Sequence, residues 1–141
     1  MSERIRLGEI LTGSGWITAD ELKGALATKP EGRRLGEHLL RLGLLGEDDL
    51  YAALSLQSGL PRGKPDPAVV SLPVTRALPV AVARKWRVLP FRIAAGELYL
   101  AGSDLPGEAM QKEVGRFSSL EIRFHLVTAT EFDELAAEYL I

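Results

Sequence analysis

Hydrophobic residues in the first 59 positions of the chain recur at helical spacing. Leu7, Ile10 and Leu11, for example, would lie on one face of a helix. Segments rich in glycine interrupt this pattern, and Thr18 followed by Glu21 has the spacing of a capping box. The pattern predicts four short helices, over residues 3–12, 18–28, 33–42 and 47–57.

The pattern changes near residue 60. Residues 60–73, LPRGKPDPAVVSLP, hold four prolines and predict an extended connector. Alternation of apolar and polar residues over 120–128 is typical of a half-buried strand. The predicted elements after the connector are a helix over 75–86, strands over 88–94 and 97–103, a helix over 105–117, the strand over 120–128 and a helix over 129–140 with Thr130 as N-cap.

These elements predict an α+β protein. Residues 1–59 would form a four-helix subdomain made of two similar helical hairpins. Residues 74–141 would form a small α/β sandwich in the order α-β-β-α-β-α.

Composition narrows the possible functions. Of 141 residues, 46% are hydrophobic, which is enough for a core. The net charge of −2 argues against a generally basic surface that binds DNA or RNA. Cysteine is absent, which excludes disulfides, and neither a signal segment nor a membrane-spanning apolar run is present. We therefore expect a cytoplasmic protein without direct membrane insertion.

The chain contains one pattern twice. Residues 6–29 laid over residues 34–57 match at ten of 24 positions, and each copy begins with Arg-Leu-Gly. Glycine inside a helix costs about 0.5–1 kcal/mol relative to alanine. Close approach of another helix, or of a flat ligand, would explain it. An adjacent arginine can stack on a ring or donate to phosphate or to a guanine edge, and a duplicated half-site suits a two-fold ligand. From the residues alone, both explanations stay open.

The repeated segment resembles a known family. Its spacing, met twice and followed by Gly59-Leu60-Pro61, is R-L-G-x-x-L-x-x-x-G-[ILV]-[IL]-x-x-x-x-L-x-x-A-L-x-x-Q. That family is the N-terminal domain of type II secretion and type IV pilus assembly ATPases, and in particular its MshEN type, which binds cyclic di-GMP. Similar domains also occur attached to membrane glycosyltransferases of the phage-adsorption type. The resemblance covers nearly the whole chain, including VARKWRVLPFRIAAGELYLAGSD.

The resemblance implies a regulatory domain of a larger protein in which each motif binds half of a cyclic di-GMP. Carried over by position, one half would be bound by Arg6, Leu7, Gly8, Leu11, Leu22 and Leu26, with Lys29 in the place of a glutamine. The other half would be bound by Arg34, Leu35, Gly36, Leu39, Leu50, Leu54 and Gln57. Asp104 falls where the family's second subdomain carries an aspartate near the ligand, and Arg4 would assist.

The first copy departs from the family pattern. Lys29 has no acceptor and cannot replace an amide, although it can donate to a phosphate, and Trp16 stands where an aliphatic residue is usual. These departures leave an alternative: a non-catalytic docking module of the same fold that has lost the nucleotide. Besides cyclic di-GMP, the expected partners of the chain are the rest of a parent ATPase or glycosyltransferase, or a cytoplasmic domain of an inner-membrane secretion component.

No catalytic constellation stands out in the chain. There is no G-x-x-x-x-G-K-[ST] phosphate loop, so ATP hydrolysis is not expected here. The two histidines, His38 and His125, lack the spacing of metal ligands. We expect no enzyme activity, no metal and no cofactor from this chain, and cyclic di-GMP as its ligand.

Overall fold

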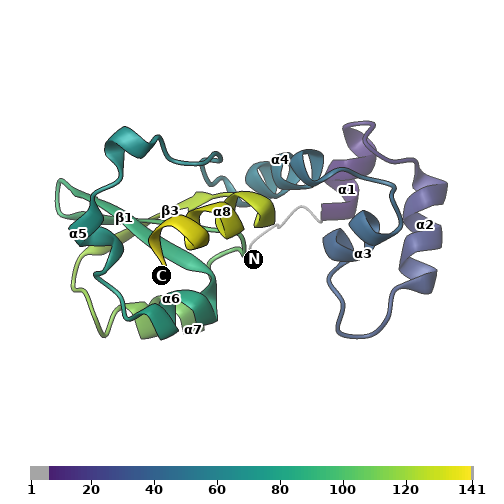
Figure 1. The fold of residues 1–141 in the computed structure, drawn as a ribbon. Coiled ribbons are helices and arrows are strands. Elements are labelled where there is room, and N and C mark those ends of the chain that lie inside the picture. The colour runs from purple at the N-terminus through teal and green to yellow at the C-terminus, as the bar shows by residue number, and fades with distance from the viewer. Residues whose placement is uncertain (1–6, 141) are drawn as a thin grey trace. The chain divides into compact units, whose positions relative to one another are not determined.

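A computed structural model describes residues 7–140 of the chain. It divides into two compact units, residues 1–59 (unit 1) and residues 60–141 (unit 2). Figure 1 shows helices in unit 1 and a sheet covered by helices in unit 2. The predicted α+β class is confirmed.

The described part of unit 1 contains α1 (Leu7–Gly13), α2 (Ala19–Thr28), α3 (Leu35–Arg41) and α4 (Glu47–Ser58). Each lies within or close to a helix predicted from periodicity; residues 3–6 of the first prediction lie outside the described part. The capping box at α2 is confirmed, because the Glu21 amide donates to the Thr18 hydroxyl at 3.1 Å and the Thr18 amide donates to the Glu21 carboxylate at 2.8 Å. The core of unit 1 includes Leu11, Ile17, Ala25, Leu39, Leu45, Leu50, Tyr51 and Ala53.

The described part of unit 2 is built on three strands, β1 (Val88–Ala94), β2 (Glu97–Gly102) and β3 (Glu121–Leu126), in the order β1-β2-β3. β1 and β2 are antiparallel and joined at Ala95-Gly96, both with positive φ. β2 and β3 are parallel, so α7 (Glu108–Val114) forms the crossover between them. The predicted strands and the helix between them are confirmed, the helix being shorter than predicted.

Residues 60–73 belong to unit 2 and are more ordered than an extended connector. Their beginning pairs with the end of β3, since the Leu126 amide donates to the Pro61 carbonyl at 2.8 Å and the Gly63 amide to the Leu126 carbonyl at 3.0 Å. A short 3-10 helix, η1 (Pro67–Val69), and the first part of α5 (Leu72–Thr75) follow.

Two predicted helix boundaries in unit 2 are wrong. Of the helix expected over 75–86, only the second part forms, as α6 (Val80–Trp86), while Thr75 is the last residue of α5. Pro79 is the N-cap of α6, because proline has no amide hydrogen and disfavours helix in the residue before it. In α8 (Ala129–Tyr139) the N-cap is Thr128 and not Thr130. Thr128 makes a capping box with Glu131, in bonds of 2.9 and 3.0 Å.

One face of the sheet in unit 2 packs against α6, which precedes the first strand, and α8, which follows the last strand. Its buried cluster joins residues of α6, β1, β2 and α8 with Val127, which follows β3, and Leu140, the C-cap of α8. The members are Ala83, Leu89, Phe91, Ala101, Val127, Phe132, Leu135 and Leu140. The opposite face is also apolar, because Leu98 and Leu100 alternate with residues of that cluster and are fully buried. Both faces of β2 are therefore buried, as expected of a central strand.

None of the helices that the structure describes combines the length and apolar character needed to cross a membrane.

Candidate functional site

The repeat seen in the sequence is also a repeat of structure. Gly15 and Gly43 both have positive φ, of 77° and 73°, and follow α1 and α3. The two helices end with the same type of C-cap. After α1 the Trp16 amide donates to the Leu11 carbonyl at 3.0 Å, and after α3 the Leu44 amide donates to the Leu39 carbonyl at 3.2 Å. This 6→1 bond is that of a Schellman motif, whose left-handed residue is usually glycine. The shared glycines at these positions thus have a structural cause.

The glycine of each Arg-Leu-Gly segment faces a leucine of the following helix. A Cβ on Gly8 would lie 3.0 Å from Cδ2 of Leu22, and a Cβ on Gly36 would lie 2.7 Å from Cδ1 of Leu50. Both pairs hold the same two positions of the repeat. Of the two explanations open at the level of sequence, close approach of a helix is therefore the one seen in this structure.

The predicted ligand-binding leucines differ in burial. Leu11, Leu39 and Leu50 are at most 4% exposed and belong to the core of unit 1. Leu26 is 52% exposed. The remaining four are half-buried: Leu7, Leu22, Leu35 and Leu54. A ligand on the surface of unit 1 would therefore meet the half-buried and exposed leucines, with the buried three beneath them.

The predicted polar residues lie at helix ends. Arg34 is the exposed N-cap of α3, and Gln57 is half-buried in the last turn of α4. Lys29 is the C-cap of α2, and its ammonium donates to the Arg33 carbonyl at 2.8 Å. Arg6 and Arg4 lie outside the described residues. Asp104 belongs to unit 2, where it follows β2 and is half-buried.

A buried polar group next to Arg34 was missed by sequence reasoning. His38 of α3 is 5% exposed, and its ring nitrogens lie 3.0 Å from the Thr28 hydroxyl and 3.4 Å from the Arg33 guanidinium. The sequence offered one signal, a histidine among the apolar positions of α3, which alone does not name its partners. No group of three or more His, Asp or Glu side chains among the residues described is placed to hold a metal ion.

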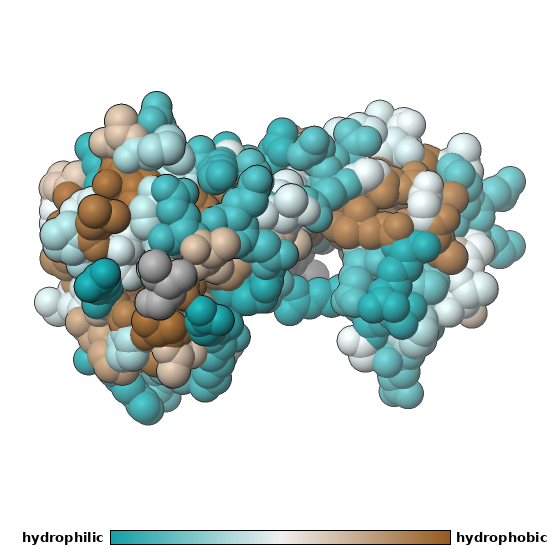
Figure 2. Space-filling view, viewed as in Figure 1, coloured by the Kyte–Doolittle hydropathy of each residue, from teal (hydrophilic) through white to brown (hydrophobic). Residues whose placement is uncertain are grey.

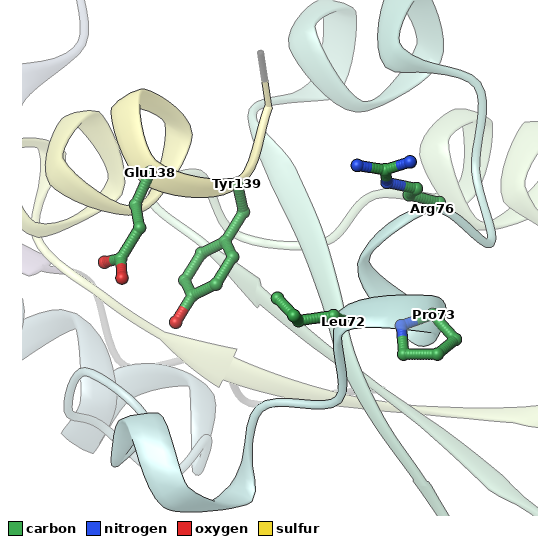
Figure 3. A pocket seen from close by; sticks show the side chains of 5 residues that line it. All are labelled: Leu72, Pro73, Arg76, Glu138 and Tyr139. Atoms are coloured by element: carbon green, nitrogen blue, oxygen red, sulfur yellow. The ribbon is translucent and has the colours of Figure 1, made fainter.

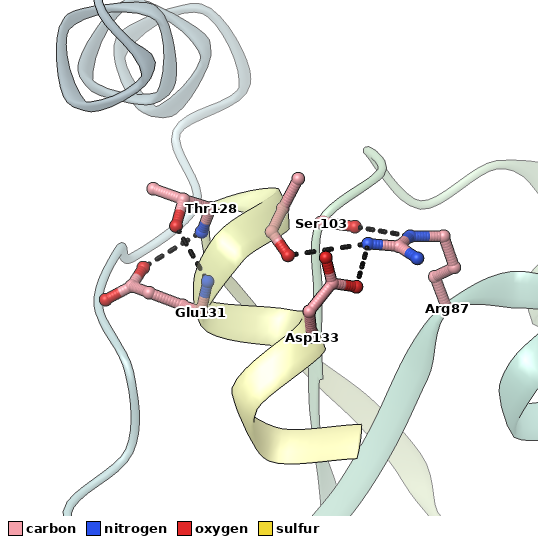
Figure 4. A network of polar contacts seen from close by, with 6 residues as sticks. Arg87, Ser103, Thr128, Glu131 and Asp133 are labelled. Atoms are coloured by element: carbon pink, nitrogen blue, oxygen red, sulfur yellow. Dashed lines mark hydrogen bonds and ion pairs between the residues drawn. The ribbon is translucent and has the colours of Figure 1, made fainter. Parts of the chain in front are cut away.

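Unit 2 has its own polar network around Arg87 (Figure 4). Arg87 ends α6 with positive φ of 50°, and its side chain donates to the Ser103 hydroxyl at 3.2 Å and to the Asp133 carboxylate at 3.0 Å. The guanidinium also lies 4.8 Å from the centre of the Phe132 ring. Arg87 thereby joins the end of β2 to the first turns of α8. Asp133 lies three positions after Thr130, the predicted N-cap, and its carboxylate binds this arginine.

A hollow of about 290 Å³ lies between α5 and α8 of unit 2 and is lined by Leu72, Pro73, Arg76, Glu138 and Tyr139. Figure 3 shows Arg76 and Glu138 on opposite sides of Tyr139. Among the predicted ligand-binding residues that the structure describes, none lines this hollow.

Comparison with known proteins identifies relatives over nearly the whole chain. The MshEN domain family matches residues 58–140. The chain is 32% identical over 114 residues to bacteriophage adsorption protein B of Escherichia coli (strain K12), covering 78% of this chain and 15% of that protein. It is 30% identical over 133 residues to the type IV pilus assembly ATPase PilB of Thermus thermophilus, covering 93% of this chain and 14% of that protein.

Solved structures show the same relationship. The structure of MshE with cdg matches with a TM-score of 0.85 and 30% identity, over 96% of this chain and 99% of that chain. The N-terminal domain of XpsE matches with a TM-score of 0.71 over 99% of both chains, and at 23% identity this likeness supports the fold alone.

The chain spans about one seventh of the length of the curated relatives it matches, at 15% and 14%. Its matches are to the N-terminal domain type and not to a catalytic domain, so the prediction that this chain is not itself an enzyme is confirmed. The resemblance predicted from the doubled motif is confirmed as well. Because the family match covers more than half of the chain and the identity to PilB reaches 30% over almost all of it, the protein belongs to the MshEN domain family.

Proposed function

We propose that this chain is a regulatory domain that binds cyclic di-GMP through the two Arg-Leu-Gly segments of unit 1. The observation that carries the proposal is the match to MshE, whose solved structure contains cdg, at 30% identity over 96% of this chain. The repeated hairpin supports it, because two similar half-sites suit a ligand made of two identical nucleotides.

The second copy of the motif is the stronger half of the proposed site. Arg34 is exposed at the start of α3, where its guanidinium can stack on a base or donate in a fork to phosphate. Half-buried Leu35 and Leu54 offer apolar surface, and Gln57 offers both a donor and an acceptor. Asp104 belongs to unit 2, and its predicted contact with the nucleotide stays a prediction.

The proposal is tested by calorimetric titration of cyclic di-GMP into the whole chain, with GMP as competitor. We expect saturable binding that Arg34→Ala weakens by about 10- to 100-fold, the range for loss of hydrogen bonds from a charged group. Arg41→Ala is the matched control, because Arg41 is an exposed arginine of the same helix and its guanidinium pairs with Glu37 at 3.4 Å. No heat at a few hundred micromolar ligand would refute the proposal.

A second function rests on the exposed apolar surface of unit 1. Leu26, Leu42 and Leu56 are exposed by 52%, 46% and 67%, and Figure 2 shows hydrophobic residues at the surface among hydrophilic ones. Such side chains suit docking of a protein partner. Two results together would favour this function: the wild-type chain does not bind cyclic di-GMP, and Leu56→Glu no longer captures a protein partner that the wild type captures.

The larger protein that the domain would regulate is also a proposal. Relatives include an ATPase of pilus assembly and a phage adsorption protein, of which this chain corresponds to a small part. We infer that the domain passes nucleotide occupancy to such a parent protein on the cytoplasmic side of the membrane.

A further inference from the structure

The segment between α2 and α3 ends directly at Arg34 and is tightly turned. The Arg33 amide donates to the Pro30 carbonyl at 3.2 Å, and Gly32, the third residue of this turn, has φ of 85°. Positive φ at the third residue is the requirement of a type II β-turn, which glycine meets without strain. The backbone path into Arg34 is thus set by a defined turn.

Lys29 holds the end of that turn. Its ammonium donates to the Arg33 carbonyl at 2.8 Å, and Lys29 itself is half-buried. This carbonyl belongs to the peptide bond whose nitrogen is that of Arg34, so the ammonium holds the peptide plane through which the chain enters Arg34. Hydrogen bonds from a charged donor are stronger than those between neutral groups.

His38 holds the other side of the same segment. The Thr28 hydroxyl lies 3.0 Å from His38 Nε2, and it can donate its one hydrogen to the Gly24 carbonyl, which also lies 3.0 Å away. A guanidinium only donates, so Nδ1 of His38 accepts from Arg33. With Nδ1 facing this donor, Nε2 is the ring nitrogen that faces the Thr28 hydroxyl. Arg33 is held through its carbonyl by Lys29 and through its guanidinium by His38.

The residues at the corresponding positions of the other copy are of different chemical types. By the 28-residue offset, Lys29 corresponds to Gln57, Thr28 to Leu56 and His38 to Ile10. None of these counterparts is ionisable. The departure of the first copy from the family pattern therefore coincides with polar contacts that hold the second copy.

We infer that Lys29 and His38 are positioning residues that hold Arg34 in place for the nucleotide, and that Lys29 is not itself a contact of the ligand. The inference rests on the proposed function of Arg34. It reverses the role that family resemblance gives Lys29. If Lys29 stood in for a lost glutamine contact, Lys29→Gln would strengthen binding; as a positioning residue, the same change weakens it.

The first test uses the protein without ligand. Backbone nitrogen order parameters are measured at Arg33 and Arg34 in the wild type and in Lys29→Gln and His38→Phe. We expect values near 0.85 in the wild type, falling toward 0.6 or below in both variants, on the usual scale from rigid to flexible backbone. Lys23→Gln is the matched control, because Lys23 is an exposed lysine of the same helix. Unchanged order at Arg34 in both variants would overturn the inference whether or not a nucleotide binds.

The second test is calorimetric titration of cyclic di-GMP into the same proteins. We expect Lys29→Gln and His38→Phe each to weaken binding about tenfold, as for loss of one charge-assisted hydrogen bond. Lys29→Arg keeps a cationic donor and should retain most of the affinity. His38 is 5% exposed and has almost no surface to offer a ligand, so its effect must act through its neighbours.

Each result of the second test has one meaning. Tighter binding by Lys29→Gln would overturn the inference, as would weakening by Lys29→Gln without weakening by His38→Phe, which would make Lys29 a ligand contact. If the wild type does not bind, the proposed function fails, while the order parameters still decide whether Lys29 and His38 hold Arg34. If His38→Phe does not fold, Thr28→Val removes the same contact from the hydroxyl side.

Discussion

Replacement of Gly36 by alanine tests whether the close packing of the repeat explains its glycines. The new Cβ would lie 2.7 Å from Cδ1 and 3.2 Å from Cδ2 of Leu50, both closer than ordinary van der Waals contact. Leu50 is 4% exposed, so its side chain has little room to change rotamer.

Two opposing terms decide the size of the effect. Alanine in place of a helical glycine stabilises by about 0.5–1 kcal/mol, whereas an extra methyl group in a packed core costs about 1–3 kcal/mol. We therefore expect Gly36→Ala to lower the free energy of unfolding by about 1 kcal/mol. At Gly8 the nearest atom, Leu22 Cδ2, is 3.0 Å away and its side chain is only half-buried. Gly8→Ala should then be close to neutral.

Gly24 supplies the matched control. It lies within α2, and a Cβ there would meet nothing within 4 Å. Gly24→Ala should therefore stabilise by about 0.5–1 kcal/mol, the full helix-propensity gain.

The assay is urea unfolding followed by tryptophan fluorescence. The chain has two tryptophans, so a Trp86→Phe background leaves Trp16 to report on unit 1 alone. The expected order of stability is Gly24→Ala, wild type, Gly8→Ala and Gly36→Ala, from highest to lowest. If Gly36→Ala were as stable as Gly24→Ala, close helix approach would not explain the glycine, and ligand approach would return as its cause.

Two further predictions concern unit 2. Thr128→Ala should lower the free energy of unfolding by about 1 kcal/mol, because it removes the N-cap of α8. Thr130→Ala should change it by less than about 0.5 kcal/mol. Equal effects of the two variants in thermal unfolding would contradict Thr128 as the N-cap. Burial lowers the pKa of the His125 imidazole from its usual 6.5, so as the pH drops the unfolded chain binds a proton at this residue before the folded chain does. The free energy of unfolding should therefore fall as the pH drops through 6.5. In thermal melts between about pH 8 and pH 5, His125→Asn should reduce this dependence of stability on pH, and an unchanged dependence would contradict the reasoning.

Elements that depend on local pattern were predictable from the sequence. Helical periodicity, the capping box at Thr18 and the alternation in β3 involve residues within a few positions of each other, and the structure agrees with them. The 28-residue repeat was also visible, and with it the family, because motif spacing is a property of the chain itself. The candidate ligand residues came from that resemblance.

Choices between equally good local signals were decided by tertiary structure. Thr128 and Thr130 each have an acidic residue three positions later, so both are plausible N-caps. In the structure Thr128 is the N-cap of α8, and Asp133, the residue three positions after Thr130, binds Arg87, which is 46 positions away in the sequence. The reason for Gly36 could not be settled from sequence either, since it depends on how closely Leu50 approaches.

Lys29 shows the same limit at the candidate site. Its sequence position suggested a substitute ligand contact, whereas in the folded chain its ammonium reaches the carbonyl that precedes Arg34. His38 became meaningful only when α2 and α3 brought Thr28 and Arg33 to its two nitrogens. The sequence by itself determined the elements that depend on local pattern and the family that the chain resembles. Tertiary structure decided which polar groups meet, because hydrogen bonds depend on distances and directions that residue spacing does not specify.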